Sequence, residues 1–158
     1  TSLLDAHVLF DVIPDDVATD ELLSRYPHVI SVENPDAQPV ISSSQRSRFE
    51  LPYTVRVSAS RPAAAEGLTI HLVNYNRDEP PKGRNGKPSG GRGISDEKPI
   101  PVPASKVHIR IPADQTVSTV NFLTPETETP QRLESRIESG VLHVTLPEFL
   151  VYGVLHIE

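Results

Sequence analysis

A short polar cluster of Asn74, Tyr75, Asn76 and Arg77 ends the apolar run that begins at Leu68. Proteins bind sugars with an aromatic ring that stacks on the sugar face and with amide and guanidinium groups that hydrogen-bond the hydroxyls. These four residues therefore predict a carbohydrate-binding site. The alternative is structural, with Tyr75 packed at the edge of the domain and the asparagine side chains bound to turn backbone. The absence of Trp from the chain favours this alternative.

Pairs of acidic residues occur at Asp15–Asp16, Asp78–Glu79 and Asp96–Glu97. Glycoside hydrolysis needs two carboxyl groups held roughly 5 to 10 Å apart across a cleft. Neighbouring acids do not meet this requirement by themselves, and charged side chains usually lie in water. We therefore expect the two later pairs to be solvated and Asp15 or Asp16 to cap a helix. No catalytic residue is predicted.

Three histidines, His71, His108 and His143, fall on the outward-facing phase of their expected strands. Imidazoles gathered on one sheet face could bind a metal ion. That arrangement would require the three strands to be neighbours in register, and no metal-ligand spacing motif accompanies them. We therefore expect exposed strand histidines, and we predict no metal site and no cofactor.

Several classes of function lack their sequence signatures. The chain has no Gly-x-Ser-x-Gly elbow, phosphate loop or dinucleotide fingerprint, and the Gly-rich segment Gly90–Gly93 follows no expected strand and precedes no helix. A formal charge of −6 argues against nucleic acid as a partner. No apolar run approaches the ~20 residues needed to cross a membrane. The absence of Cys leaves the compartment undecided.

Residues 49–158 are predicted to fold as a mainly β, antiparallel sandwich of immunoglobulin-like size. Apolar and polar residues alternate in short segments, as in Leu68, Ile70 and Leu72, and turn residues separate the segments. The expected strands are residues 52–59, 68–73, 106–111, 116–123, 131–138, 141–146 and 150–157, with a turn at Gly140.

A long loop at residues 77–103 interrupts this pattern. It contains five glycines, and its six basic and four acidic residues give a local charge of +2 in an acidic chain. Loops of this length are uncommon in compact domains and are often functional or disordered. It is either a loop that contacts a ligand or partner or a flexible insertion, and loop composition alone favours the second.

Residues 1–34 predict a small βαβ segment, the remnant of an α/β domain. Ala6–Ile13 reads as a strand, an amphipathic helix follows Pro14, and His28–Val32 reads as a second strand. Residues 35–48 are rich in Pro, Ser and Gln and are predicted to be a linker. The chain contains no Met, even at position 1, so we expect it to be processed or excised from a larger protein. Its first residues lack the features of a signal peptide.

Two parts of the chain carry a resemblance to a known group of enzymes. Leu3–Asp16, with the helix and strand after it, resembles a segment of the glutamine-amidotransferase-like α/β domain that follows the catalytic barrel in β-galactosidase-type glycoside hydrolases. Leu68–Asn76 resembles the second strand of the small β-sandwich that closes such enzymes, where a His-Leu-Val-Asn-Tyr run is usual, and Phe149–Ile157 fits its last strand. The resemblance covers roughly two-thirds of the chain.

The resemblance implies origin and architecture, with carbohydrate hydrolysis as the activity of the parent protein. The rest of the amidotransferase-like domain is missing between Val32 and Phe49, and so is the barrel with the two catalytic carboxylates, so no catalytic residue is carried over. The sequence thus predicts a non-catalytic accessory module from the C-terminal region of a glycoside hydrolase. Its expected partner is the catalytic domain or a second copy of the chain.

Two other functions stay open. The first is a carbohydrate-binding module that uses Asn74–Arg77, and the second is a free-standing enzyme. An accessory module should show an exposed apolar patch, which we expect near Val8, Phe10 and Val29.

Overall fold

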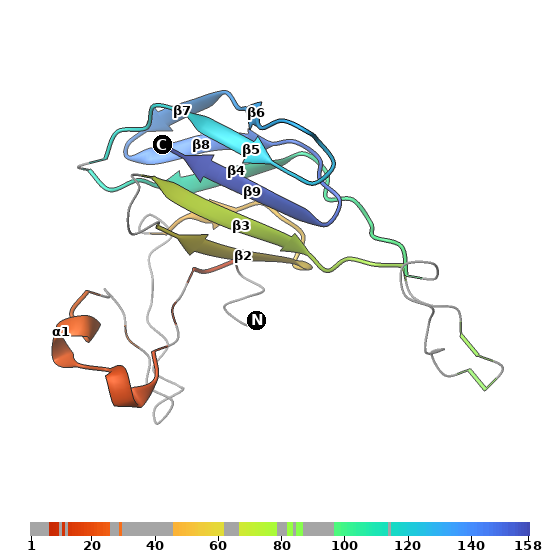
Figure 1. Cartoon of the computed structure of the whole chain (residues 1–158), viewed down its shortest axis with the longest axis horizontal. Helices are drawn as coiled ribbons and strands as arrows, with labels where there is room; N and C mark the ends of the chain where they lie inside the picture. Colours follow the sequence, from red (N-terminus) through yellow and green to blue (C-terminus); the bar gives the residue numbers. More distant parts are fainter. Residues whose placement is uncertain are drawn as a thin grey trace.

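The computed structural model describes residues 7–9, 11, 13–25, 29, 46–61, 67–78, 82–83, 85–86, 97–113 and 115–158. These residues form two antiparallel β-sheets and little helix, which confirms the predicted mainly β sandwich (Figure 1). The four-stranded sheet has the order β1 (Arg48–Phe49), β4 (Ser105–Arg110), β8 (Val141–Leu146) and β7 (Ser135–Glu138). The five-stranded sheet has the order β2 (Val55–Ser60), β3 (Leu68–Asn74), β9 (Tyr152–Ile157), β5 (Val120–Leu123) and β6 (Gln131–Arg132).

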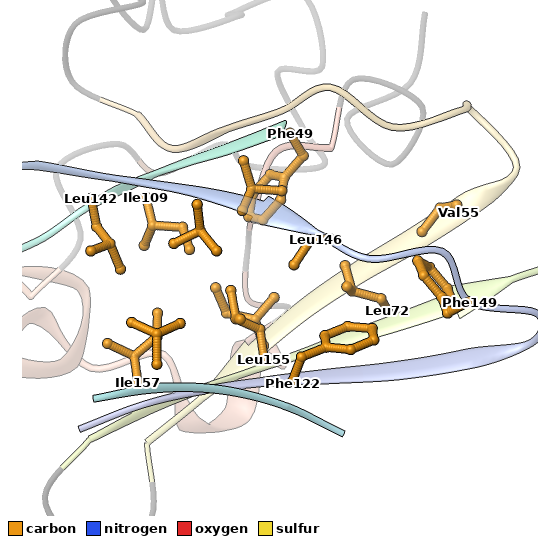
Figure 2. Packing of buried hydrophobic residues seen from close by; sticks show 14 of the residues in the cluster. Phe49, Val55, Leu72, Ile109, Phe122, Leu142, Leu146, Phe149, Leu155 and Ile157 are labelled. Carbon is orange, nitrogen blue, oxygen red and sulfur yellow. The ribbon is translucent and has the colours of Figure 1, made fainter. Parts of the chain in front are cut away.

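The core lies between the sheets because each central strand turns alternate side chains inward. In β3, Ile70 and Leu72 are fully buried, whereas His71 between them and Val73 after them are partly exposed. Burial of each such side chain contributes about 1.5–3 kcal/mol. Figure 2 shows side chains of both sheets meeting in this layer. The buried apolar residues are Phe49, Val55, Ile70, Leu72, Val102, Val107, Ile109, Ile111, Val120, Phe122, Leu142, Val144, Leu146, Phe149, Leu155 and Ile157.

A tight turn joins β7 to β8. Ser139 and Gly140 both have positive φ, 51° and 74°, and the residues before and after them, Glu138 and Val141, are paired. Two consecutive positive φ values are characteristic of the turn whose twist matches the flanking strands of a hairpin. The turn predicted at Gly140 is confirmed.

Three expected strands differ from those observed. The strand expected at residues 116–123 begins only at Val120, after Ser118 N and Thr119 N have both donated to Glu158 O. The segment 131–138 was expected to be one strand, but it divides into β6 of the five-stranded sheet and β7 of the four-stranded sheet. Between them Leu133 packs against the core, and its amide donates to Val120 O. The chain therefore crosses from one sheet to the other at this point. The strand expected from residue 52 begins at Val55, because the amide of Val55 closes a turn onto Pro52 O.

The predicted strand at Ala6–Ile13 is wrong for the residues that the structure describes there. His7, Val8 and Leu9 join no β-ladder; instead Leu9 packs against the sandwich core, and the buried His7 has its Nε2 3.2 Å from Pro52 O. A strand is stable only when a neighbour pairs its backbone groups. The second expected strand, His28–Val32, lies outside the described residues except for Val29.

Two short helical turns follow, η1 (Asp15–Val17) and α1 (Asp20–Leu23), and α1 lies outside the two sheets in Figure 1. Thr19 caps α1, because its Oγ1 accepts from Leu22 N at 3.3 Å, so the cap expected at Asp15 or Asp16 is not the cap of this helix. Neither turn is long and apolar enough to span a bilayer, and the same holds for any helix within the described ranges. Phe10 and most of the expected linker at 35–48 lie outside those ranges.

The long loop at 77–103 leaves the sandwich as a paired stem. Asp78 N donates to Lys98 O at 2.9 Å, Ile100 N donates to Asn76 O at 3.1 Å, and Arg77 forms a β-bridge with Pro99. The acidic residues Glu79 and Asp96 and the segment 87–96 lie outside the described residues.

Candidate functional site

Asn74 is the best-bonded residue of the predicted carbohydrate-binding cluster. It is fully buried at the end of β3, and its Nδ2 donates to Ile100 O at 2.8 Å and to Leu150 O at 2.7 Å. Its Oδ1 accepts from Asn76 N at 2.9 Å. A buried amide with both donors and its acceptor satisfied fixes backbone, here the start of the loop stem and the approach to β9. Asn74 therefore has a structural role and presents no surface to a ligand.

Asn76 and Arg77 are half-buried beside it. The Arg77 guanidinium donates through Nη1 to Asn74 O at 3.0 Å and to Asn76 O at 2.7 Å. These bonds cap the carbonyl groups at the end of β3 and use one of the guanidinium's nitrogen atoms. The structural alternative, in which the asparagine side chains bind backbone, thus describes Asn74, and the Arg77 side chain adds backbone bonds of its own.

Tyr75 is different, because 63% of its surface is exposed. Its amide donates to Thr54 O at 3.0 Å, which places it at the end of the β2–β3 ladder. Tyr53, next to Thr54, is 71% exposed. Two exposed aromatic residues therefore stand at one end of the same ladder. The sequence analysis did not include Tyr53 in the candidate site. Only the pairing of β2 with β3 places Tyr53 beside the end of the Asn74–Arg77 cluster.

A shallow, open hollow with a volume of about 300 Å³ lies on the five-stranded sheet, at the end of β5 and the beginning of β9. Its floor includes Tyr152 and Val154, which alternate with the buried Gly153 and Leu155 and so face outward. Glu128 is its one acidic lining residue. The lining residues are Leu123, Thr124, Pro125, Thr127, Glu128, Thr129, Pro130, Tyr152 and Val154.

The three histidines considered as metal ligands do not meet. His71 lies on the five-stranded sheet, where its Nδ1 is 2.6 Å from the Tyr152 hydroxyl. His108 and His143 lie directly opposite each other on β4 and β8 of the four-stranded sheet, with their Nδ1 atoms 2.9 Å apart. Within the described ranges, no group of three or more His, Cys, Asp or Glu side chains could hold a metal ion.

The acidic side chain with a clear electrostatic perturbation is Glu158. The Thr119 hydroxyl donates to its Oε2 at 2.9 Å, and His156 Nε2 lies 3.1 Å from its Oε1. These hydrogen bonds, that of Thr119 first, hold the pKa of the Glu158 carboxyl below its ordinary value. The Glu158 carboxyl group is exposed and follows the end of β9, whereas Glu128 lines the hollow at the beginning of β9. These two carboxyl groups therefore do not face each other across a cleft.

Comparison with known proteins gives likeness in fold. No protein-family model and no curated protein sequence matches the chain. The solved structure of α-L-fucosidase isoenzyme 2 from Paenibacillus thiaminolyticus matches with a TM-score of 0.52 and 19% identity, over 74% of this chain and 16% of that one. At this identity the likeness establishes the shared β-sandwich fold.

A second solved structure, a cycloisomaltooligosaccharide glucanotransferase from Paenibacillus sp. in complex with cycloisomaltoheptaose, has a TM-score of 0.48 and 18% identity, over 77% of this chain and 18% of that one. Both structural neighbours are glycoside-hydrolase-related proteins, and the chain spans less than a fifth of the length of either.

Proposed function

We propose that the chain is a non-catalytic accessory β-sandwich module of a glycoside hydrolase, and that it packs against the catalytic domain of the same protein. One observation carries the proposal: among the described residues that line the hollow beside Tyr152, Glu128 is the acidic one, and the carboxylate of the neighbouring Glu126 is bound by the Thr124 hydroxyl. Glycoside hydrolysis uses two carboxyl groups that face each other across the substrate. A sandwich with an apolar core, structural polar groups and one acid in its hollow suits a scaffold.

The fold comparison gives weaker support. A β-sandwich of similar fold makes up 16% of the α-L-fucosidase chain, a proportion that fits a small module within a larger enzyme. Fold alone does not determine function, so this likeness supports the proposal by analogy.

The test is the reading frame that encodes residues 1–158. An accessory module requires a catalytic domain in the same polypeptide. Where that domain is present, deletion of residues 46–158 should lower the temperature at which the enzyme loses activity, while aryl-glycoside turnover at low temperature persists. A reading frame that encodes no catalytic domain contradicts the proposal, as does a deletion that leaves thermal inactivation unchanged.

Carbohydrate binding is the second candidate, and the exposure of Tyr53 and Tyr75 at one end of the β2–β3 ladder favours it. Exposed tyrosine rings offer apolar faces on which sugar rings stack. Asn76 and Arg77, the two half-buried members of the cluster, stand beside Tyr75 in the chain and would supply the polar contacts.

NMR titration of the chain with plant and algal oligosaccharides tests this second candidate. We expect shift changes at Tyr53, Tyr75 and Asn76, and a loss of affinity of about 10-fold in Tyr75→Ala, which corresponds to ~1.4 kcal/mol. Ile137→Ala is the control, because Ile137 is 48% exposed but lies on β7 of the other sheet. An absence of shifts around the two tyrosines, or equal losses in both variants, contradicts carbohydrate binding at this end of the ladder.

A further inference from the structure

A row of four side chains crosses the outer face of the four-stranded sheet. Register places Arg48 of β1 opposite His108 of β4, His108 opposite His143 of β8, and His143 opposite Arg136 of β7. Residues directly opposite in an antiparallel pair have their Cβ atoms about 5 Å apart, close enough for two imidazoles to share one ligand. The side chains of His108 and His143 are 24% and 25% exposed, so a small ion reaches them from water.

Each imidazole has a carboxylate at its far nitrogen. Nε2 of His108 is 3.4 Å from Oε1 of Glu50, and Nε2 of His143 is 3.9 Å from Oε2 of Glu138. A carboxylate beside one ring nitrogen favours the proton on that nitrogen. Metal-binding histidines usually have such a partner, because it fixes the tautomer and orients the other nitrogen toward the metal.

With both Nε2 atoms protonated, the two Nδ1 atoms present lone pairs to each other across 2.9 Å. Lone pairs at this separation repel unless a cation lies between them. Either a shared proton or a metal ion between the two Nδ1 atoms would remove this repulsion. For metal–nitrogen bonds of about 2.05 Å, two nitrogens 2.9 Å apart subtend an angle of about 90° at the metal. That is the angle between adjacent ligands in the square-planar or tetragonal sites of Cu²⁺ and Ni²⁺, and it is smaller than the tetrahedral angle of zinc sites.

The charges within the row are paired. Arg48 pairs with Glu50 at 3.0 Å, and Arg136 pairs with Glu138 at 3.2 Å. The row itself therefore carries no excess positive charge, while Lys106 and Arg110, exposed on the same face of β4 two residues to either side of His108, bring positive charge to its edge. Each of the two glutamates lies beside both an arginine and a histidine.

We propose that His108 and His143 form a two-nitrogen site for a divalent transition-metal ion of the Cu²⁺ or Ni²⁺ class, with water in the remaining positions. The two Nδ1 atoms are the ligands, and Glu50 and Glu138 are positioning residues. The site extends beyond the accessory role and does not depend on it. It also differs from the three-histidine site that the sequence analysis considered and did not favour, because two of the histidines meet and the third belongs to the other sheet.

The test is a titration of the tag-free chain with CuCl₂ and, separately, ZnCl₂, followed by calorimetry and by electron paramagnetic resonance of the copper samples. We expect one Cu²⁺ per chain, a copper spectrum with coupling to two nitrogens, and weaker binding of Zn²⁺. His108→Gln and His143→Gln should each weaken copper binding at least 10-fold. Glu50→Gln should weaken it about 10-fold, as expected for the loss of a carboxylate that lies beside the other ring nitrogen of a ligand.

Two further measurements keep the result interpretable. His71→Gln and His156→Gln remove histidines from the five-stranded sheet and should leave copper binding unchanged. In the unaltered chain, Cu²⁺ should broaden the NMR signals of His108, His143 and their neighbours first, which requires no variant to fold. Absence of binding, binding unaffected by both His→Gln substitutions, or broadening centred elsewhere would each show that the pair holds only a proton and would overturn the proposal.

Discussion

At the scale of single residues, buried polar groups of the sandwich bind backbone. The Asn74 side chain binds Asn76 just after it in the chain, Ile100 on the returning side of the loop stem, and Leu150 shortly before β9. The sequence offered this structural role as an alternative to sugar binding, and it could not decide between them. The reason is physical: the burial of Asn74 depends on β9 and the loop stem, which only the folded chain brings together.

Asn74→Ala should lower the free energy of unfolding by about 3 kcal/mol, because it leaves two carbonyl groups and one amide without partners in a buried place. Urea denaturation at an unchanged m-value measures the loss. The matched control is Asn76→Ala, a half-buried neighbour, which should cost no more than ~0.5 kcal/mol. Equal small losses in the two variants would contradict the structural role of Asn74.

Glu158 gives a prediction about pH. Its pKa is lowered by the Thr119 hydroxyl and by His156, so the folded protein holds the carboxylate form more strongly than the unfolded chain does. The resulting stabilisation is complete above the ordinary value of 4.5 and is lost as the pH falls through the lower, folded value.

An NMR titration of the Glu158 carboxyl measures this pKa directly. Thr119→Val should raise the pKa of Glu158 toward 4.5, because it removes the hydrogen bond that lowers this pKa most. Ser118→Ala is the matched control, since the Ser118 hydroxyl donates to the Glu158 main-chain oxygen and not to the carboxylate. A carboxyl that titrates identically in all three proteins would refute the assigned hydrogen bond.

At the scale of elements, alternation of apolar and polar residues predicted the strands that line both sides of the core. β3, β4 and β8 lie within a residue or two of their expected positions, because one face of each is buried throughout. β6 and β7 could not be separated in advance, since all of their residues are exposed and carry no alternation. Leu133 marks the division, because its amide still bonds to Val120 of β5 and the next strand, β7, pairs with β8 of the other sheet.

The packing of β9 against β5 depends on a glycine. A Cβ at Gly153 would lie 2.7 Å from Cζ and 2.8 Å from Cε2 of Phe122. Gly153→Ala should therefore lower the free energy of unfolding by about 1–3 kcal/mol, as an overpacked core does. In a Phe122→Leu background the same substitution should cost at least ~0.5 kcal/mol less, because the ring is gone. Calorimetric melting of the unaltered chain, the two single variants and the double variant measures this coupling. A destabilisation by Gly153→Ala that does not depend on residue 122 would rule out this contact.

At the scale of the whole molecule, the sequence predicted the sandwich and left its surfaces undetermined. The pairing of His108 with His143 joins strands 35 residues apart. The approach of Tyr53 to the end of β3 likewise depends on the register of β2 and β3. No local pattern encodes such a register, so the candidate surfaces became visible only in the folded chain. Of the apolar patch expected near Val8, Phe10 and Val29, Val29 is 55% exposed, Val8 is half-buried and Phe10 lies outside the described residues, so the patch stays a prediction.

The central proposal is that this sandwich is a scaffold without glycosidase chemistry of its own. Its most direct test is the hydrolysis of a panel of aryl glycosides by the purified chain at high concentration, with Glu128→Gln alongside. We expect release of the aryl group at the rate of the buffer blank in both proteins. Hydrolysis that persists through repurification and falls in Glu128→Gln would contradict the claim and would make the hollow beside Tyr152 an active site.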